Sequence, residues 1–236
     1  MSDAYKVTVK NRSGASQNYS FFAANPVVAG GASGRVWSNV MRSTPDTPND
    51  GKAVLELPTS YYAICGSYEG SPETQGRVSI SKTVPIDLGT SNGDSIAMGS
   101  TVNLIVNNRS ACDFEAPVSP GDGKIGSFVV NTTTAPGKEF TTQDAVNNHL
   151  LVGIAHCKDD DLFTAMATFT PQPNSQYQIM PQAIVYVAAG PRLKAGQVVM
   201  HETLVNTIAV DFKLRGDNEV VLSHNNNGEF KFEDPE

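Results

Sequence analysis

Apolar and polar residues alternate along several short stretches of the chain, which is the pattern of half-buried β-strands. Tyr5, Val7 and Val9 alternate with polar neighbours and predict a strand near the start of the chain. The clearest alternation covers residues 78–88, and residues 204–214 repeat it. Pro85 favours a sheet edge or a bulge for the first of these strands, because proline donates no backbone hydrogen bond to a neighbouring strand.

Two hairpins and one short helix complete the expected elements. Residues 150–157 and 162–169 predict one hairpin, and residues 220–223 and 229–232 predict a second across an Asn-Gly turn. Thr141 is placed to cap a single helical turn toward Asp144. Short strands separated by frequent turn residues, with very little helix, indicate an all-β fold, a β-sandwich.

Parts of the chain appear twice in the same order. Residues 58–64 resemble residues 173–179, and residues 84–88 resemble residues 208–212. This repetition predicts two related sandwich halves, residues 1–98 and 99–236, with Tyr62 matching Tyr177 and Leu88 matching Phe212. One merged sandwich, whose sheets mix strands from both halves, is equally compatible with the sequence.

Charge and composition exclude several classes of function. The chain has 236 residues and a net charge of −7, whereas binding to nucleic acid or to an anionic membrane surface needs clustered Lys and Arg. The first residues show no charged segment followed by an apolar one, so we expect no secretory leader, and no apolar run approaches the roughly 20 residues that span a bilayer. We therefore expect a cytoplasmic protein.

The cysteine and histidine residues do not form a recognisable metal-binding motif. Three cysteines are an odd number at no metal-ligand spacing, so we expect reduced thiols. His149 and His156 are seven positions apart, which places them on opposite faces of a regular strand. No cofactor motif is present either, so we expect neither a metal nor a cofactor.

Two groups of residues are candidates for a site at the junction of the halves. A glycine-rich loop precedes Arg35 and Trp37, and these two residues could form an aromatic ligand wall with Tyr61 and Tyr68. Histidine titrates near neutral pH, so proton transfer, if the protein is an enzyme, is assigned to a second group. That group consists of His156, His201 and Glu202.

Two functions from different classes follow. The first is a non-catalytic binding protein that recognises a carbohydrate or another small molecule through loops or through the cleft between the halves. The second is a cofactor-free isomerase or cyclase of a small-molecule pathway, which needs only a shaped pocket and a proton donor or acceptor. A structural or self-assembling protein is a weaker third option, and formation of a homo-oligomer is left open.

Overall fold

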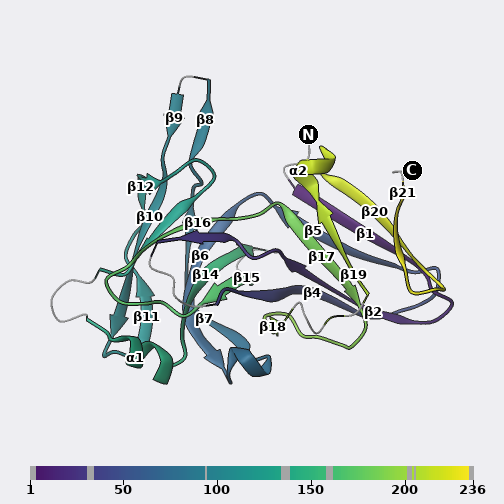
Figure 1. Cartoon of the computed structure of the whole chain (residues 1–236), viewed down its shortest axis with the longest axis horizontal. Coiled ribbons are helices and arrows are strands. Elements are labelled where there is room, and N and C mark those ends of the chain that lie inside the picture. The colour runs from purple at the N-terminus through teal and green to yellow at the C-terminus, as the bar shows by residue number, and fades with distance from the viewer. Residues whose placement is uncertain are drawn as a thin grey trace.

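The structure, a computed structural model, describes residues 4–30, 35–93, 95–133, 139–157, 162–200, 204 and 206–233. Within these residues strands dominate, which confirms the all-β fold (Figure 1). Helix is confined in the described ranges to α1 (Thr142–Asn147), α2 (Phe212–Arg215) and the 3₁₀ helix η1 (Pro72–Thr74). The strands form three larger sheets and one small hairpin.

The large sheet contains eight strands in a row. Their order is β19 (Thr207–Asp211), β17 (Ile184–Ala189), β2 (Gln17–Ala23), β4 (Trp37–Thr47), β15 (Phe163–Phe169), β14 (Leu150–Cys157), β6 (Tyr61–Glu69) and β7 (Arg77–Ile86). The short strand β18 (Val198–Val199) pairs with β4. The segment that carries β18 also accepts a hydrogen bond from Val78 of β7 at Gly196, and its Val198 donates one to Gly76, just before β7. It therefore links the β7 end of the large sheet back to β4.

Two smaller sheets accompany the large sheet. The terminal sheet has the order β21 (Phe230–Glu233), β20 (Glu219–Asn225), β1 (Ala4–Arg12) and β5 (Lys52–Pro58), with β1 parallel to β20. The middle sheet has the order β11 (Ala111–Phe114), β10 (Gly99–Asn107), β13 (Phe128–Asn131), β16 (Gln176–Met180) and β3 (Val27–Ala29), and β12 (Val118–Gly123) also pairs with β10. The hairpin of β8 (Thr90–Asn92) and β9 (Ser95–Ala97) projects beyond the middle sheet (Figure 1).

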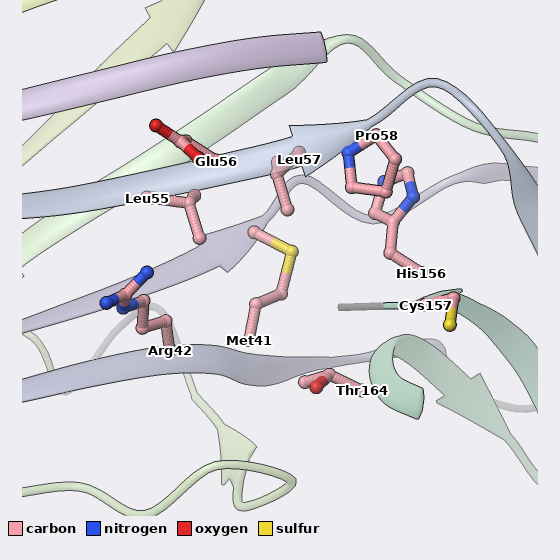
Figure 2. A pocket seen from close by; sticks show the side chains of 9 residues that line it. All are labelled: Met41, Arg42, Leu55, Glu56, Leu57, Pro58, His156, Cys157 and Thr164. Carbon is pink, nitrogen blue, oxygen red and sulfur yellow. The ribbon is translucent and has the colours of Figure 1, made fainter. Parts of the chain in front are cut away.

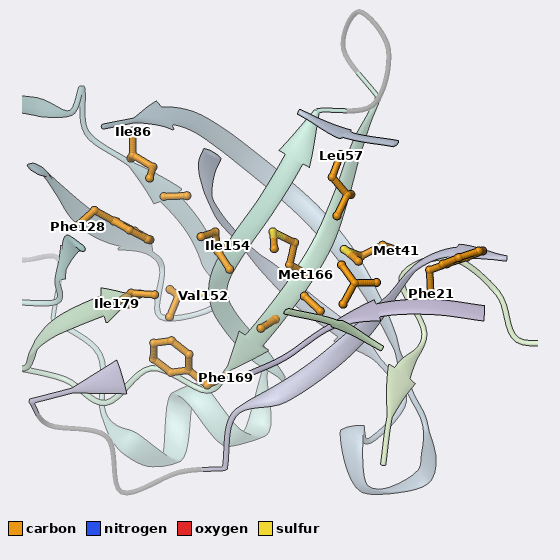
Figure 3. Close-up of a cluster of buried hydrophobic side chains, with 14 of the residues drawn as sticks. Phe21, Met41, Leu57, Ile86, Phe128, Val152, Ile154, Met166, Phe169 and Ile179 are labelled. Carbon is orange, nitrogen blue, oxygen red and sulfur yellow. The ribbon is translucent and has the colours of Figure 1, made fainter. Parts of the chain in front are cut away.

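One continuous hydrophobic core joins all three sheets. Phe169 and Ile154 of the large sheet belong to the same buried cluster as Phe128 and Ile179 of the middle sheet (Figure 3). The same cluster extends to Leu57 and other residues of the terminal sheet. Because apolar side chains from three sheets share one core, the sheets stabilise one another by burial.

Aromatic contacts connect the large sheet to each of its partners. Phe169 packs edge-on against Tyr177 of the middle sheet, with ring centroids 4.9 Å apart. On the other side, the Tyr19 hydroxyl lies 3.0 Å from Nδ1 of His224 in the terminal sheet. Phe230 also stacks on His224, with ring centroids 4.7 Å apart.

Most of the expected local elements are confirmed. Residues 77–86 form β7 at the end of the large sheet, where Pro85 is tolerated, and both expected hairpins form as β14–β15 and β20–β21. Helix α1 begins after Thr141, whose hydroxyl accepts a hydrogen bond from the Asp144 backbone while the Asp144 carboxylate accepts one from Thr141.

The strand expected over residues 204–214 is wrong at its end. The strand stops at Asp211, whose side chain accepts a hydrogen bond from the Leu214 backbone and caps α2. Gly216 then closes this helix in the left-handed conformation, with φ 73°. Cap chemistry therefore overrides the alternation, and Leu214 is 85% exposed.

The two expected halves do not separate in space. Each of the three sheets contains strands from both sides of residue 99. The structure does not show an internal duplication. Tyr62 lies on β6 of the large sheet, whereas Tyr177 lies on β16 of the middle sheet.

All three cysteines are free thiols, and two of them meet in the core. Cys65 of β6 and Cys112 of β11 hydrogen-bond to each other between the large and middle sheets. This contact, together with burial, raises the pKa of the Cys65 thiol.

Replacement of Phe169 by alanine tests the contact between the large and middle sheets. We expect the Phe169→Ala variant to lose about 3–5 kcal/mol of unfolding free energy, because a buried ring is replaced by a cavity. The Leu214→Ala variant is the control and should change stability by less than about 0.5 kcal/mol, since its side chain is exposed. Urea denaturation measures both values, and equal small losses would show that Phe169 does not hold the sheets together.

Candidate functional site

A wide groove lies where the chain passes from the terminal sheet to the large sheet. Residues 59–61, which connect β5 to β6, form one part of it, and the end of β7 and the start of β12 form others. Residues 96–98, at the base of the β8–β9 hairpin, complete the lining. We call this surface the junction groove. Its volume is about 870 Å³, within the range of about 300–1,000 Å³ that is typical of small-molecule sites.

The junction groove combines apolar surface with a few polar groups. Its apolar lining comes from Tyr61, Ile86, Leu88, Ile96, Ala97 and Met98. Its polar lining includes Thr59, Ser60, Asp87, Thr90 and Ser119. Apolar contact area with a small number of placed hydrogen-bonding groups is the usual composition of a ligand site.

Asp87 is held in the groove by contacts on both its backbone and its side chain. Its backbone N–H donates to Ser100 Oγ at 2.9 Å, and its carbonyl accepts from the Ser100 N–H at 2.9 Å. Its carboxylate accepts a hydrogen bond from Ser119 Oγ at 2.8 Å. The neighbouring Gly89 is required by close packing, because a Cβ atom there would lie 2.3 Å from the Lys124 carbonyl oxygen. The carboxylate is therefore fixed at the surface of the groove.

The β8–β9 hairpin presents apolar side chains to solvent at the edge of the groove. Ile96 is 63% exposed and Met98 is 39% exposed. In the described part of the chain, β8 and β9 pair only with each other. Exposed apolar residues beside a groove are a feature of surfaces that bind ligands or partners.

His156 lies behind the groove and is buried. Its Nδ1 is 2.9 Å from the Ser60 carbonyl oxygen, and its ring lies 4.8 Å from the ring of Tyr61. Burial lowers the pKa of His156 to about 4, although the hydrogen bond to Ser60 acts in the opposite direction. Burial, with a smaller contribution from Tyr5, raises the pKa of Tyr61 to about 12. Both side chains are therefore neutral at pH 7.

The cavity beside His156, whose lining side chains Figure 2 shows, is too small for a substrate. It is lined by residues that include Met41, Leu57, Pro58 and Cys157, and its volume is about 20 Å³. A cavity of this size holds about one water molecule. His156 is thus placed to orient the Ser60–Tyr61 backbone rather than to contact a substrate through this cavity.

The structure places Trp37 and Tyr68 away from the junction groove. Both are buried in one cluster with Leu151 and Val198, and the Arg35 guanidinium lies over the Trp37 ring at 4.4 Å from its centroid. The exposed fraction is 6% for Trp37 and 4% for Tyr68, so these rings pack inside the protein and offer little surface to a ligand.

The expected site residues that the structure describes lie on two different faces of the large sheet. Leu151 and His156 are five positions apart on β14, so their side chains point to opposite faces of the large sheet. Because Trp37 packs with Leu151, it lies on the face opposite to His156. Among the described site residues, Tyr61 meets His156 on one face of the large sheet, while Arg35, Trp37 and Tyr68 gather in a separate cluster. His201 and Glu202 lie outside the described residues.

Sequence reasoning missed Asp87, Ser119, Ile96 and Met98 as site residues. In the sequence, Asp87 is a polar residue near the end of the alternating stretch of residues 78–88, and such a position favours a role in a turn or at a strand end. The available signal was the turn-rich stretch of residues 89–95, because loops on a rigid scaffold often carry binding residues. That signal does not indicate which other segments face the loop.

Comparisons with known protein families, curated proteins and solved structures find no match to this chain. Among the described residues, no group of three or more His, Cys, Asp or Glu is arranged to hold a metal ion. In the same ranges, neither α-helix is long and apolar enough to cross a bilayer.

The depressed pKa of His156 predicts a specific dependence of stability on pH. The unfolded state binds a proton near pH 6.5, whereas the folded state binds it only near pH 4. The His156 contribution is therefore fully present above pH 6.5, and about 3 kcal/mol is lost as the pH falls to 4.

The His156→Gln variant isolates this contribution from the other titrating groups. We expect the unfolding free energy of the variant to fall less steeply than that of the wild type between pH 6.5 and pH 4. Urea denaturation at several pH values measures the difference between the two proteins. If the unfolding free energies of the two proteins fell in parallel over this range, His156 would take up its proton at the same pH in the folded and unfolded states, and its pKa would not be lowered.

Proposed function

We propose that this protein is a non-catalytic binding protein whose junction groove recognises a carbohydrate or another small molecule. The observation that supports the proposal most directly is the composition of the groove. Tyr61, Ile96 and Met98 provide apolar contact area, while Asp87 and Ser119 provide oriented polar atoms. A sugar ring has an apolar face and a rim of hydroxyl groups, and it matches such a lining.

The burial of His156 favours binding over catalysis. A cofactor-free isomerase or cyclase needs a proton donor or acceptor within hydrogen-bond reach of its substrate. The cavity beside His156 admits about one water molecule, and the groove is lined by Tyr61 in front of it. Tyr61 itself, with a pKa of about 12, is a weak acid at pH 7. Within the described part of the chain, neither His156 nor Tyr61 therefore has a pKa suited to general acid–base catalysis near pH 7.

Replacement of Ile96 by serine tests the groove as the binding site. We expect the Ile96→Ser variant to bind a ligand identified from a glycan and small-molecule array about tenfold more weakly, because it removes apolar surface that the ligand covers. Folding should be unaffected, since the side chain is already exposed. Isothermal titration calorimetry measures the affinity.

The Leu214→Ser variant is the matched control, because it replaces another exposed aliphatic residue outside the groove. Its affinity for the same ligand should equal that of the wild type. Equal affinities of the wild type and the Ile96→Ser variant would place the binding site elsewhere. Turnover of the bound compound that disappears in the His156→Gln variant would favour the enzyme.

A further inference from the structure

The junction groove has a marked charge asymmetry. Among the described residues that line it, Asp87 is the only one that carries a charge at pH 7. The Tyr61 hydroxyl is the other ionisable group, and its raised pKa keeps it neutral. No lysine or arginine belongs to the described lining, so the groove presents one negative charge to a ligand.

The Asp87 carboxylate keeps unused capacity for hydrogen bonds. The hydrogen bond from Ser119 Oγ uses one of its acceptor positions, and within the described ranges it forms no ion pair. An ionised carboxylate has about four acceptor positions on its two oxygens. A positively charged donor at this position would form a charge-assisted hydrogen bond, which is stronger than one between neutral groups.

The surroundings of Asp87 select for a cation that also has an apolar part. Ile86 and Leu88 flank it in sequence and line the same groove, and Tyr61 adds an aromatic ring, whose face attracts cations. The whole chain has a net charge of −7, which raises the local concentration of cations and lowers that of anions. The negative charge of Asp87 and the negative net charge of the chain therefore both favour a cation over an anion.

We propose that the junction groove binds a small molecule that carries an ammonium group next to an apolar face, with Asp87 as its counter-ion. This inference rests on the proposed binding function and names the class of ligand. An amino sugar and an arylalkylamine both have this chemistry.

Two sets of matched probes separate the effect of charge from that of shape. The first set is glucosamine, glucose and glucuronate, and the second is 2-phenylethylamine, 2-phenylethanol and 3-phenylpropionate. Within each set the body is similar and the charge is positive, zero or negative. Chemical-shift titration of the ¹⁵N-labelled full chain locates the binding site and measures the affinity of each probe.

We expect the ammonium member of at least one set to bind in the groove about tenfold more tightly than the neutral member, with the anion weakest. The Asp87→Asn variant should abolish this preference but keep the affinity for the neutral probe, because asparagine retains an acceptor for Ser119. The Asp217→Asn variant removes the same charge from an exposed site outside the groove and should keep the preference.

The failures of the two proposals are distinguishable. Equal binding of the neutral and ammonium probes in the groove, unchanged in the Asp87→Asn variant, would overturn the ammonium inference and leave the binding function standing. An equal loss of preference in the Asp217→Asn variant would also overturn it, because the charge effect would then be global. If no probe shifts any groove resonance, both proposals fail.

Discussion

The large sheet has an apolar face that must be buried, and side chains from both smaller sheets share the core that buries it. The terminal sheet has four strands and covers one end, while the middle sheet covers the other. Phe169 on the large sheet meets Tyr177 of the middle sheet, and Tyr19 meets His224 of the terminal sheet. The shared core makes the stability of each small sheet dependent on the large one.

The junction groove is a consequence of this arrangement. The chain leaves the terminal sheet at Pro58 and enters the large sheet at Tyr61, so residues 59 and 60 cross between the sheets. The buried His156 holds this crossing through the Ser60 carbonyl and packs against the Tyr61 ring. The crossing residues form one part of the groove and the base of the exposed β8–β9 hairpin forms another, and the groove between them is open to solvent. Among the described residues that line the groove, Asp87 supplies its single carboxylate.

Local structure was predictable where neighbouring residues decide it. The alternation around Val7 and along residues 78–86 specifies strands because every second side chain must be buried. Thr141 and Asp144 specify the start of α1 because both hydrogen-bonding groups lie within one turn. Local chemistry also explains why the strand prediction fails at Leu214. Leu214 continues the alternation of apolar residues, but the hydrogen bond by which Asp211 caps α2 outweighs that pattern.

The sequence by itself determined the all-β class, most strands and the capped helix, because these depend on contacts between residues close in the chain. Only the tertiary structure decided which strands share a sheet and which faces meet. It buried Trp37 and Tyr68 in one cluster and placed Tyr61 and His156 on the opposite side of the large sheet. It also brought Asp87 to Ser119, which is 32 residues away. Such contacts depend on how sheets pack over long separations in sequence, and no local pattern of residues encodes them.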